Sequence, residues 1–175
     1  MKYFVKFFVI TFLVFISTYS KAENEKVLYI DLTVVLNESK AGAEAQTFLT
    51  KTANDNVKKF RETEASLKEK EKDLIAKKNI LNKEDYKKMS DTLRKEVQEY
   101  QKNRESFFQK VAKQRADARA KLIEALKPVL ENYSKENNVS IIMNSKDVLF
   151  AKTELNITKP VIDLLNKKLP SLNLK

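Results

Sequence analysis

The sequence predicts an α+β protein in which a small strand-containing body carries a long antiparallel helical hairpin, the arm. Residues 43–127 contain neither Gly nor Pro and are dense in Lys, Glu, Ala, Gln and Leu, which favour helices. Apolar residues recur there with heptad spacing, and β-branched runs flank the segment on both sides. We therefore assign residues 43–127 to the arm, and residues 23–42 and 128–175 to the body.

Residues 1–22 have the pattern of a secretory signal peptide. Lys2 and Lys6 precede an apolar run over residues 7–16, and a polar stretch with small residues follows. The run is shorter than the roughly 20 apolar residues that a membrane-spanning helix needs. We expect cleavage after Ala22 and export to a periplasmic or extracellular location. An uncleaved N-terminal anchor is the alternative.

The arm has the spacing of an antiparallel coiled coil. An apolar residue recurs every seventh position from Ala53 to Leu81, and from Tyr86 onward apolar residues follow a spacing of three and four. Asn82 and the acidic residues after it favour a new helix start after a turn over residues 79–85, with a single unbroken helix as the alternative. Because the first half has about one apolar residue per heptad, we expect weak packing and bending toward the tip.

The body is predicted to contain strands and a final helix. Three runs are rich in β-branched and aromatic residues: 26–32, 139–143 and 148–150. Residues 144–147 would join the last two as a hairpin, and Thr158 is a candidate N-cap of a helix that ends near Leu169. So small a sheet has open edges, which we expect other copies to pair in an oligomer. Six residues are assigned to the body core or to contacts between copies: Leu28, Ile30, Ile141, Met143, Leu149 and Phe150.

The composition excludes most enzyme and metal chemistry. Cys and His are absent and there is one Gly, which removes thiol and imidazole catalysis, common zinc sites and Gly-rich phosphate loops. We expect no enzyme, no cofactor and no metal. Of the net charge of +10, most lies in residues 43–127, with 22 Lys and Arg against 15 Asp and Glu. This excess favours an acidic client, anionic lipid or nucleic acid, and export makes nucleic acid the least expected.

The last third of the chain carries the most specific pattern. It reads Leu126-Lys127-Pro128-Val129-Leu130, followed by residues 133–139, 141–143, 148–151, 155–158 and 161–166. The tail comes after a signal peptide, a strand leading to residues 35–39 and a charged hairpin. With its parts in this order, the chain resembles the Skp (OmpH) family of periplasmic chaperones. The resemblance implies a trimer with a shared β-barrel body and three arms around a cavity. It also implies an ATP-independent holdase that keeps unfolded outer-membrane proteins from aggregating. Some members contact lipopolysaccharide, but no motif carries that contact over to residues of this chain.

Client contact is expected along the arm, from apolar groups outside the seam and from the Lys cluster near the turn: Phe107, Phe108, Tyr86, Lys77, Lys78, Lys83, Lys87 and Lys88. Phe107 and Phe108 are adjacent and cannot both point into one seam. Their alternative role is to pack the arm where it meets the body. Tyr86 has a seam position as its alternative, and each Lys a solvated surface. Two other classes of protein fit parts of the pattern: an envelope coiled-coil adaptor without chaperone activity, and a basic nucleic-acid binder.

Overall fold

The computed structural model describes residues 25–174, so the predicted signal peptide lies outside the described residues. The elements are β1 (Lys26–Ile30), α2 (Leu32–Glu38), α3 (Lys40–Ala76), α4 (Lys83–Asn137), β2 (Val139–Asn144) and α5 (Thr158–Lys168). Single 3-10 turns follow β2 at Ser145–Asp147 and precede α5 at Thr153–Leu155. The fold is α+β with a helical hairpin, as predicted. Within residues 25–174 no helix is long and apolar enough to cross a membrane.

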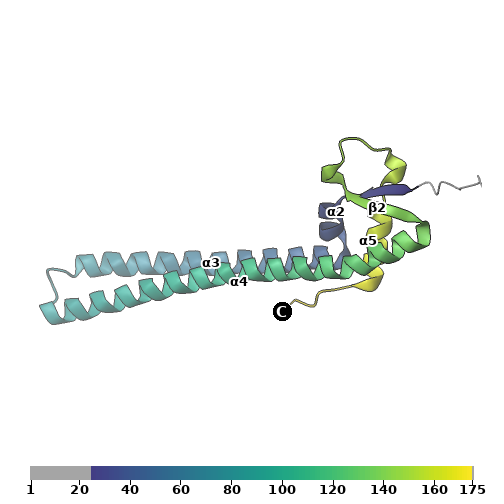
Figure 1. Ribbon diagram of the computed structural model, residues 1–175. Helices are drawn as coiled ribbons and strands as arrows, with labels where there is room; N and C mark the ends of the chain where they lie inside the picture. Colours follow the sequence, from purple (N-terminus) through teal and green to yellow (C-terminus); the bar gives the residue numbers. More distant parts are fainter. Residues whose placement is uncertain (1–24, 175) are drawn as a thin grey trace, which may run out of the picture.

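A two-helix arm projects from a small body (Figure 1). Helix α3 runs outward over 37 residues, and α4 returns over 55 residues into the body. Between them the Asn82 side chain accepts a hydrogen bond from the Asp85 N–H at 2.9 Å. Glu84 and Asp85 add negative charge at the positive start of α4. The predicted cap at Asn82 is confirmed, and the single unbroken helix is excluded.

Helix α4 continues through Pro128, the residue at which the sequence division begins the body. Proline lacks an N–H and leaves the Glu124 carbonyl without its helical partner. Leu126 and Val129 beside it are buried and hold the helix against the core. The helix ends at Asn138, whose left-handed φ of 53° lets its N–H bond a carbonyl of the last turn. One helix therefore belongs to both the arm and the body.

The sheet consists of two parallel strands, in which Val27 faces Ile141 and Ile30 faces Asn144. The whole arm is the connection between these strands, so the helical hairpin brings two distant parts of the sequence into one body (Figure 1). At the other edge of β1, the Ile157 N–H donates to the Tyr29 carbonyl at 3.0 Å.

The predicted third strand over residues 148–150 is wrong. β2 passes directly into the turn at Ser145–Asp147, and the chain then leaves the sheet without pairing. Leu149 and Phe150 are 107% and 89% exposed. A strand is stabilised by a neighbouring strand and a covered face, and within the described chain residues 148–150 have neither.

The body core lies between the sheet, α4 and α5. Of the six residues assigned to the body from the sequence, only Leu28 and Ile30 enter this core, which contains Leu28, Ile30, Val35, Leu126, Val129, Val139, Ile157, Val161 and Leu165. A smaller root cluster of Leu36, Ala41 and Leu122 lies where the arm meets the body. Because α2 contributes Val35 to the core and Leu36 to the root cluster, it links the two.

The start of α5 differs from the prediction. Thr158 lies within the helix, and the Asn156 side chain accepts its N–H at 2.9 Å, so Asn156 satisfies this helix start. The Thr158 hydroxyl instead accepts the Asp31 N–H at 2.8 Å. This bond ties α5 to the end of β1 and explains why Thr158 is buried.

Candidate functional site

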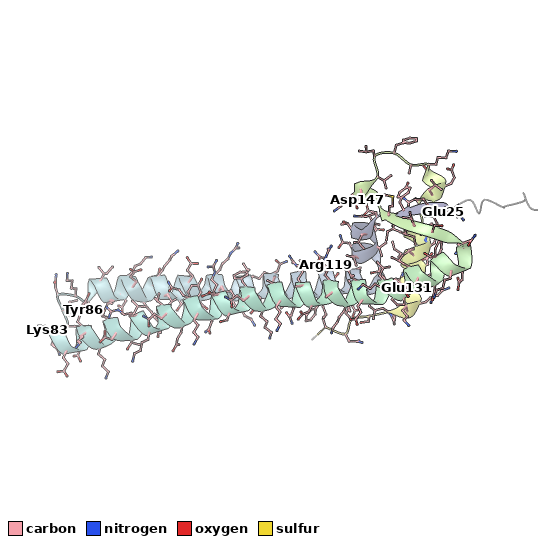
Figure 2. All side chains as sticks on the ribbon, in the orientation of Figure 1. Glu25, Lys83, Tyr86, Arg119, Glu131 and Asp147 are labelled. Carbon is pink, nitrogen blue, oxygen red and sulfur yellow. The ribbon has the colours of Figure 1, made fainter. Side chains whose placement is uncertain are left out.

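Exposed side chains that are candidates for contact lie in three places: the arm tip, the middle of the arm and one face of the body. Figure 2 shows Lys83 and Tyr86 at the tip, Arg119 near the root of the arm and Asp147 on the body. In the part of the chain that the structure describes, no cluster of three or more acidic side chains is arranged to hold a metal ion. The candidate site is therefore built from surfaces.

An aromatic cluster joins the two helices in the middle of the arm. The Phe60 ring of α3 lies near three rings of α4, with centroid distances of 5.5 Å to Phe107, 6.1 Å to Tyr100 and 6.3 Å to Phe108. Phe107 is half-buried, whereas Phe108 is 41% exposed, with the Arg104 guanidinium 5.4 Å from its ring centroid. This cluster is about 22 Å of helix from the root cluster. The alternative in which these rings pack the arm onto the body is therefore wrong.

The predicted tip residues lie around the turn between α3 and α4. Tyr86 is half-buried, and the Lys77 ammonium is paired with the Asp73 carboxylate at 2.7 Å. Four lysines are exposed and form no ion pair within residues 25–174: Lys78, Lys83, Lys87 and Lys88. From Tyr86 to Phe107, α4 runs about 32 Å. The predicted residues thus form two separate surfaces on one arm.

Two exposed isoleucines at the tip were missed by the sequence reasoning. Ile75 is 63% exposed and Ile80 is 79% exposed. Both fall outside the seven-residue apolar series of the first helix, and this offset was the signal that could have found them. Together with the neighbouring lysines they make the tip a mixed apolar and basic surface.

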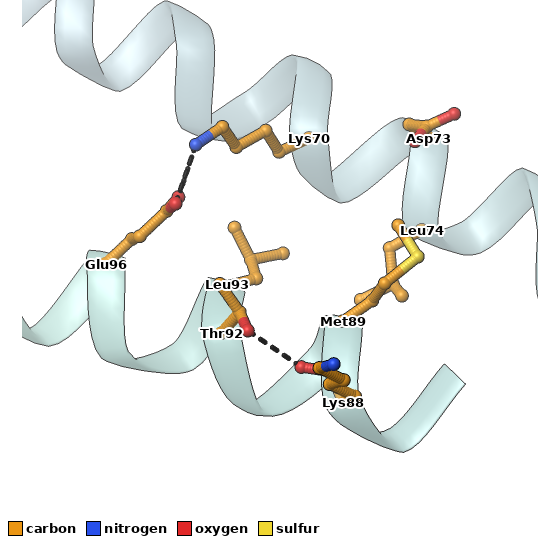
Figure 3. Close-up of a pocket in the computed structure, with 8 residues that line it drawn as sticks. All are labelled: Lys70, Asp73, Leu74, Lys88, Met89, Thr92, Leu93 and Glu96. Carbon is orange, nitrogen blue, oxygen red and sulfur yellow. Dashed lines mark hydrogen bonds and ion pairs between the residues drawn. The ribbon is translucent and has the colours of Figure 1, made fainter. Parts of the chain in front are cut away.

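A groove opens between the two helices near the tip (Figure 3). Leu74, Met89 and Leu93 line it, and the Lys70 ammonium and Glu96 carboxylate bridge the helices at 2.7 Å beside it. Its volume is about 370 Å³, so the coiled-coil seam is incompletely filled here. Along α3 no residue is buried between Leu49 and Leu74, which confirms the sparse packing predicted from the apolar series.

Most of the basic charge of the arm is unpaired. Only five of the 22 Lys and Arg in residues 43–127 form an ion pair within the described chain. A hydrogen bond from the Lys68 ammonium lowers the pKa of the Glu64 carboxyl, and the same bond raises the pKa of Lys68. Both groups of this pair are therefore ionised at neutral pH, and their opposite charges cancel locally. The unpaired cations give the arm a positive field that attracts anionic partners.

One face of the body is apolar and exposed. Ile141 and Met143 on β2 are 50% and 37% exposed, and Leu149 and Phe150 follow on the adjoining loop. Val27, which faces Ile141 across the strands, is 41% exposed. Within residues 25–174 the outer edge of β2 has no strand beside it. A free strand edge next to large exposed apolar side chains is typical of an association surface.

A protein-family model described as outer membrane protein (OmpH-like) matches residues 26–165 of this chain. The chain belongs to the OmpH-like family. This confirms the resemblance to the Skp (OmpH) family inferred from the tail. The OmpH-like match begins at β1 and ends within α5, so both the body and the arm are part of the family's shared fold.

Among solved structures, this OmpH-like chain is similar to one from Caulobacter crescentus CB15 that is described as a candidate outer membrane chaperone (OmpH-like). The TM-score is 0.78 at 16% sequence identity, over 86% of this chain and 89% of that chain. At this identity the likeness establishes a common fold. Among curated proteins, none matches the chain.

Proposed function

We propose that this member of the OmpH-like family is an ATP-independent holdase chaperone of the periplasm. It binds unfolded outer-membrane proteins and prevents their aggregation during transit to the outer membrane. The observation that carries the proposal is the arm, which bears unpaired cations and isolated exposed apolar side chains along a thinly packed hairpin. Many weak contacts on such arms hold an extended chain without requiring one sequence. The similarity to a structure described as an outer membrane chaperone supports the same role.

The client contacts are proposed to come from both arm surfaces. Unpaired tip lysines attract acidic unfolded chains, and Ile75, Ile80 and Phe108 contact apolar client segments. Lys77 contributes less because Asp73 already neutralises its charge. Anionic lipid or lipopolysaccharide is a further proposed partner of the same cations, and no contact with nucleic acid is expected.

The chaperone is proposed to work as a homo-oligomer. In each copy residues 23–42 and 128–175 form the body that contacts the other copies, and residues 43–127 form the arm. The exposed face around Ile141 and Phe150 and the free edge of β2 support contacts between copies. A trimer is the state implied by the family resemblance. Several arms around one space would raise the effective concentration of binding groups near a client.

The proposal is tested with the chain from residue 23 to residue 175, without nucleotide. A urea-unfolded outer-membrane barrel protein is diluted into it, and light scattering is recorded at low and high salt. We expect suppressed scattering near one oligomer per client, weaker at high salt because salt screens the arm cations. If scattering is suppressed equally at low and high salt, the chaperone activity is supported and the proposed electrostatic attraction between arm and client is contradicted. No suppression at several-fold excess would favour the envelope adaptor, which would bind a folded partner stoichiometrically.

A further inference from the structure

Both helices of the arm have a weak point where they join the body. Ser39 ends α2 and begins α3 with an extended backbone, at a ψ of 147°, so these two helices meet at a bend. In α4, Pro128 removes one helical hydrogen bond. Helices bend at such interruptions. The inclination of the arm to the body therefore depends on contacts from outside these helices.

Helix α5 supplies the first of these contacts. The Asn166 side chain accepts the Lys40 N–H at 2.7 Å. This N–H lies in the first turn of α3, where no helical carbonyl is available to it. The two residues are 126 positions apart in the sequence, so the bond joins the end of α5 to the arm just beyond the bend at Ser39.

The segment that follows α5, residues 169–174, continues onto the arm. It leaves the helix at Pro170 and runs beneath the arm (Figure 1). Leu169 and Leu172 pack against the root cluster, whose three residues come from α2, α3 and α4. The segment therefore contacts the arm and the body on both sides of the bend. It also lies beyond residue 165, where the family match ends.

The contact between this segment and α3 is apolar and loosely packed. Leu172 and Leu174 share the lining of a cavity of about 310 Å³ with Ala45 and Phe48 of α3. Within the described chain the hydrogen bonds of residues 170–174 are internal to the segment, so its leucine side chains hold it on the arm. A segment held by a few partly buried side chains detaches at low cost in free energy.

We propose that residues 169–174 are a detachable strap that sets the inclination of the arm to the body, with Asn166 as its anchor on α5. While the strap is docked, the arm keeps one direction. When its leucines detach, the arm bends at Ser39 and Pro128 and samples a wider range of directions. In the proposed oligomer this range sets the width of the space between the arms, a consequence that rests on the proposed chaperone function. The strap itself is a property of one chain.

The test measures a distance across the weak points without any client. The chain has no Cys, so spin labels attach only at introduced thiols. Lys58→Cys on α3 and Glu131→Cys on the body end of α4 are exposed positions without an ion pair in the described chain. Double electron–electron resonance on residues 23–175, diluted with unlabelled chain, gives the distribution of distances between the two labels of one chain.

Leu172→Ser with Leu174→Ser detaches the strap. We expect the distance distribution to become about twofold wider, because the arm no longer has one favoured direction. Helix content measured by circular dichroism should be unchanged, since neither leucine belongs to the body core. Leu174→Ser alone removes one of the two contacts and should give an intermediate width.

Two control variants separate the strap contacts from a general disturbance. Leu172→Met with Leu174→Met keeps apolar side chains of similar volume and should retain the native width. Lys168→Ser changes an exposed position at the end of α5, next to the strap. It should leave the distribution unchanged.

Equal widths in the native chain and in both Ser variants would overturn the proposal. Broadening that also occurs with Met at both positions, or in Lys168→Ser, would overturn it as well, because the width would then not depend on the leucine contacts. The distance measurement is independent of the scattering assay. A chain that fails to suppress aggregation would lose the proposed function, while the strap would still be judged by its own distance distributions.

Discussion

At the junction of α2 and α3 the backbone leaves no space for a side chain. A Cβ on Gly42 would lie 1.8 Å from the Leu36 carbonyl oxygen and 2.9 Å from the Ser39 hydroxyl. The Ser39 hydroxyl also accepts the Gly42 N–H at 3.3 Å as the cap of α3. The single glycine of the chain is therefore required by close approach, and it sets the point from which the arm leaves the body.

Gly42→Ala is expected to destabilise the protein by about 1–3 kcal/mol, as other overpacking substitutions do. The methyl group forces the end of α2 away from α3 and opens the root cluster. Thermal unfolding monitored by circular dichroism measures the effect. Ala43→Ser, an exposed neighbour, should leave the unfolding midpoint unchanged. An unchanged midpoint for Gly42→Ala would contradict the close approach.

Asp31 links stability to pH. Its pKa lies below the ordinary value of 3.8, chiefly because its carboxylate accepts the Val34 N–H. A lowered pKa means that the folded state favours the charged form. This stabilisation is present above the ordinary pKa and is lost as the pH falls through the folded-state value.

Asp31→Asn keeps an acceptor oxygen for the cap and removes the titration. The difference in urea-unfolding midpoint between the native chain and this variant should be largest near neutral pH. It should begin to shrink as the pH falls below about 3.8, where the Asp31 carboxyl of the unfolded chain is protonated first, and it should vanish below the lower folded-state pKa. A difference that stays constant over this range would show that the charge of Asp31 makes no contribution.

The arm is a long element that depends on few contacts. Between the root and Leu74 its main apolar contact is the aromatic cluster around Phe60. Isolated helices gain little stability from propensity alone, so the middle of the hairpin depends on this one cluster. On α3 the next buried side chain toward the tip is Leu74, and the next toward the root is Leu49.

Phe60→Ala should open the middle of the arm while the body remains folded. The ring contacts three aromatic side chains, and its loss is expected to cost about 2 kcal/mol in local opening. Hydrogen exchange of the neighbouring amides should accelerate about 30-fold, whereas amides of β1 and β2 should keep their protection. Ile75→Ala, at an exposed position, is the matched control. Uniform acceleration throughout the chain would contradict a local role.

At the scale of the whole molecule, one apolar face of the body stays exposed to solvent when the chain is alone. Val27, Ile141, Met143, Leu149 and Phe150 are all exposed, and β2 has a free edge within the described residues. Fully burying an exposed apolar side chain contributes roughly 1.5–3 kcal/mol, and Leu149 and Phe150 are the two of these that are almost fully exposed. Association between copies would therefore stabilise the body substantially.

Leu149→Ser with Phe150→Ser should convert the proposed oligomer to a monomer whose helix content is unchanged, because neither residue enters the core of one chain. Sedimentation velocity measures the change. Lys152→Ser, an exposed position on the same loop, should leave the oligomer intact. A double variant that still associates as the native chain does would exclude this face as the interface.

Sequence reasoning reached the features that depend on neighbours along the chain. The heptad series, the turn and the cap at Asn82 follow from interactions between residues three to seven positions apart. For the same reason the sparse packing of the arm was predictable, whereas the resemblance to the OmpH-like family was carried by the pattern of the tail. The basic charge of the arm was also visible, because it requires only a count.

Only the tertiary structure decided which faces are covered. Residues 148–150 have the composition of a strand but no partner in one chain, and Thr158 bonds Asp31 across the fold instead of capping its own helix. Phe107 and Phe108 meet Phe60 because the hairpin places distant positions side by side. Residues 169–174 dock on α3 for the same reason. Local patterns set the preference for helix or strand, whereas burial and strand pairing are determined by residues that are far apart in the sequence.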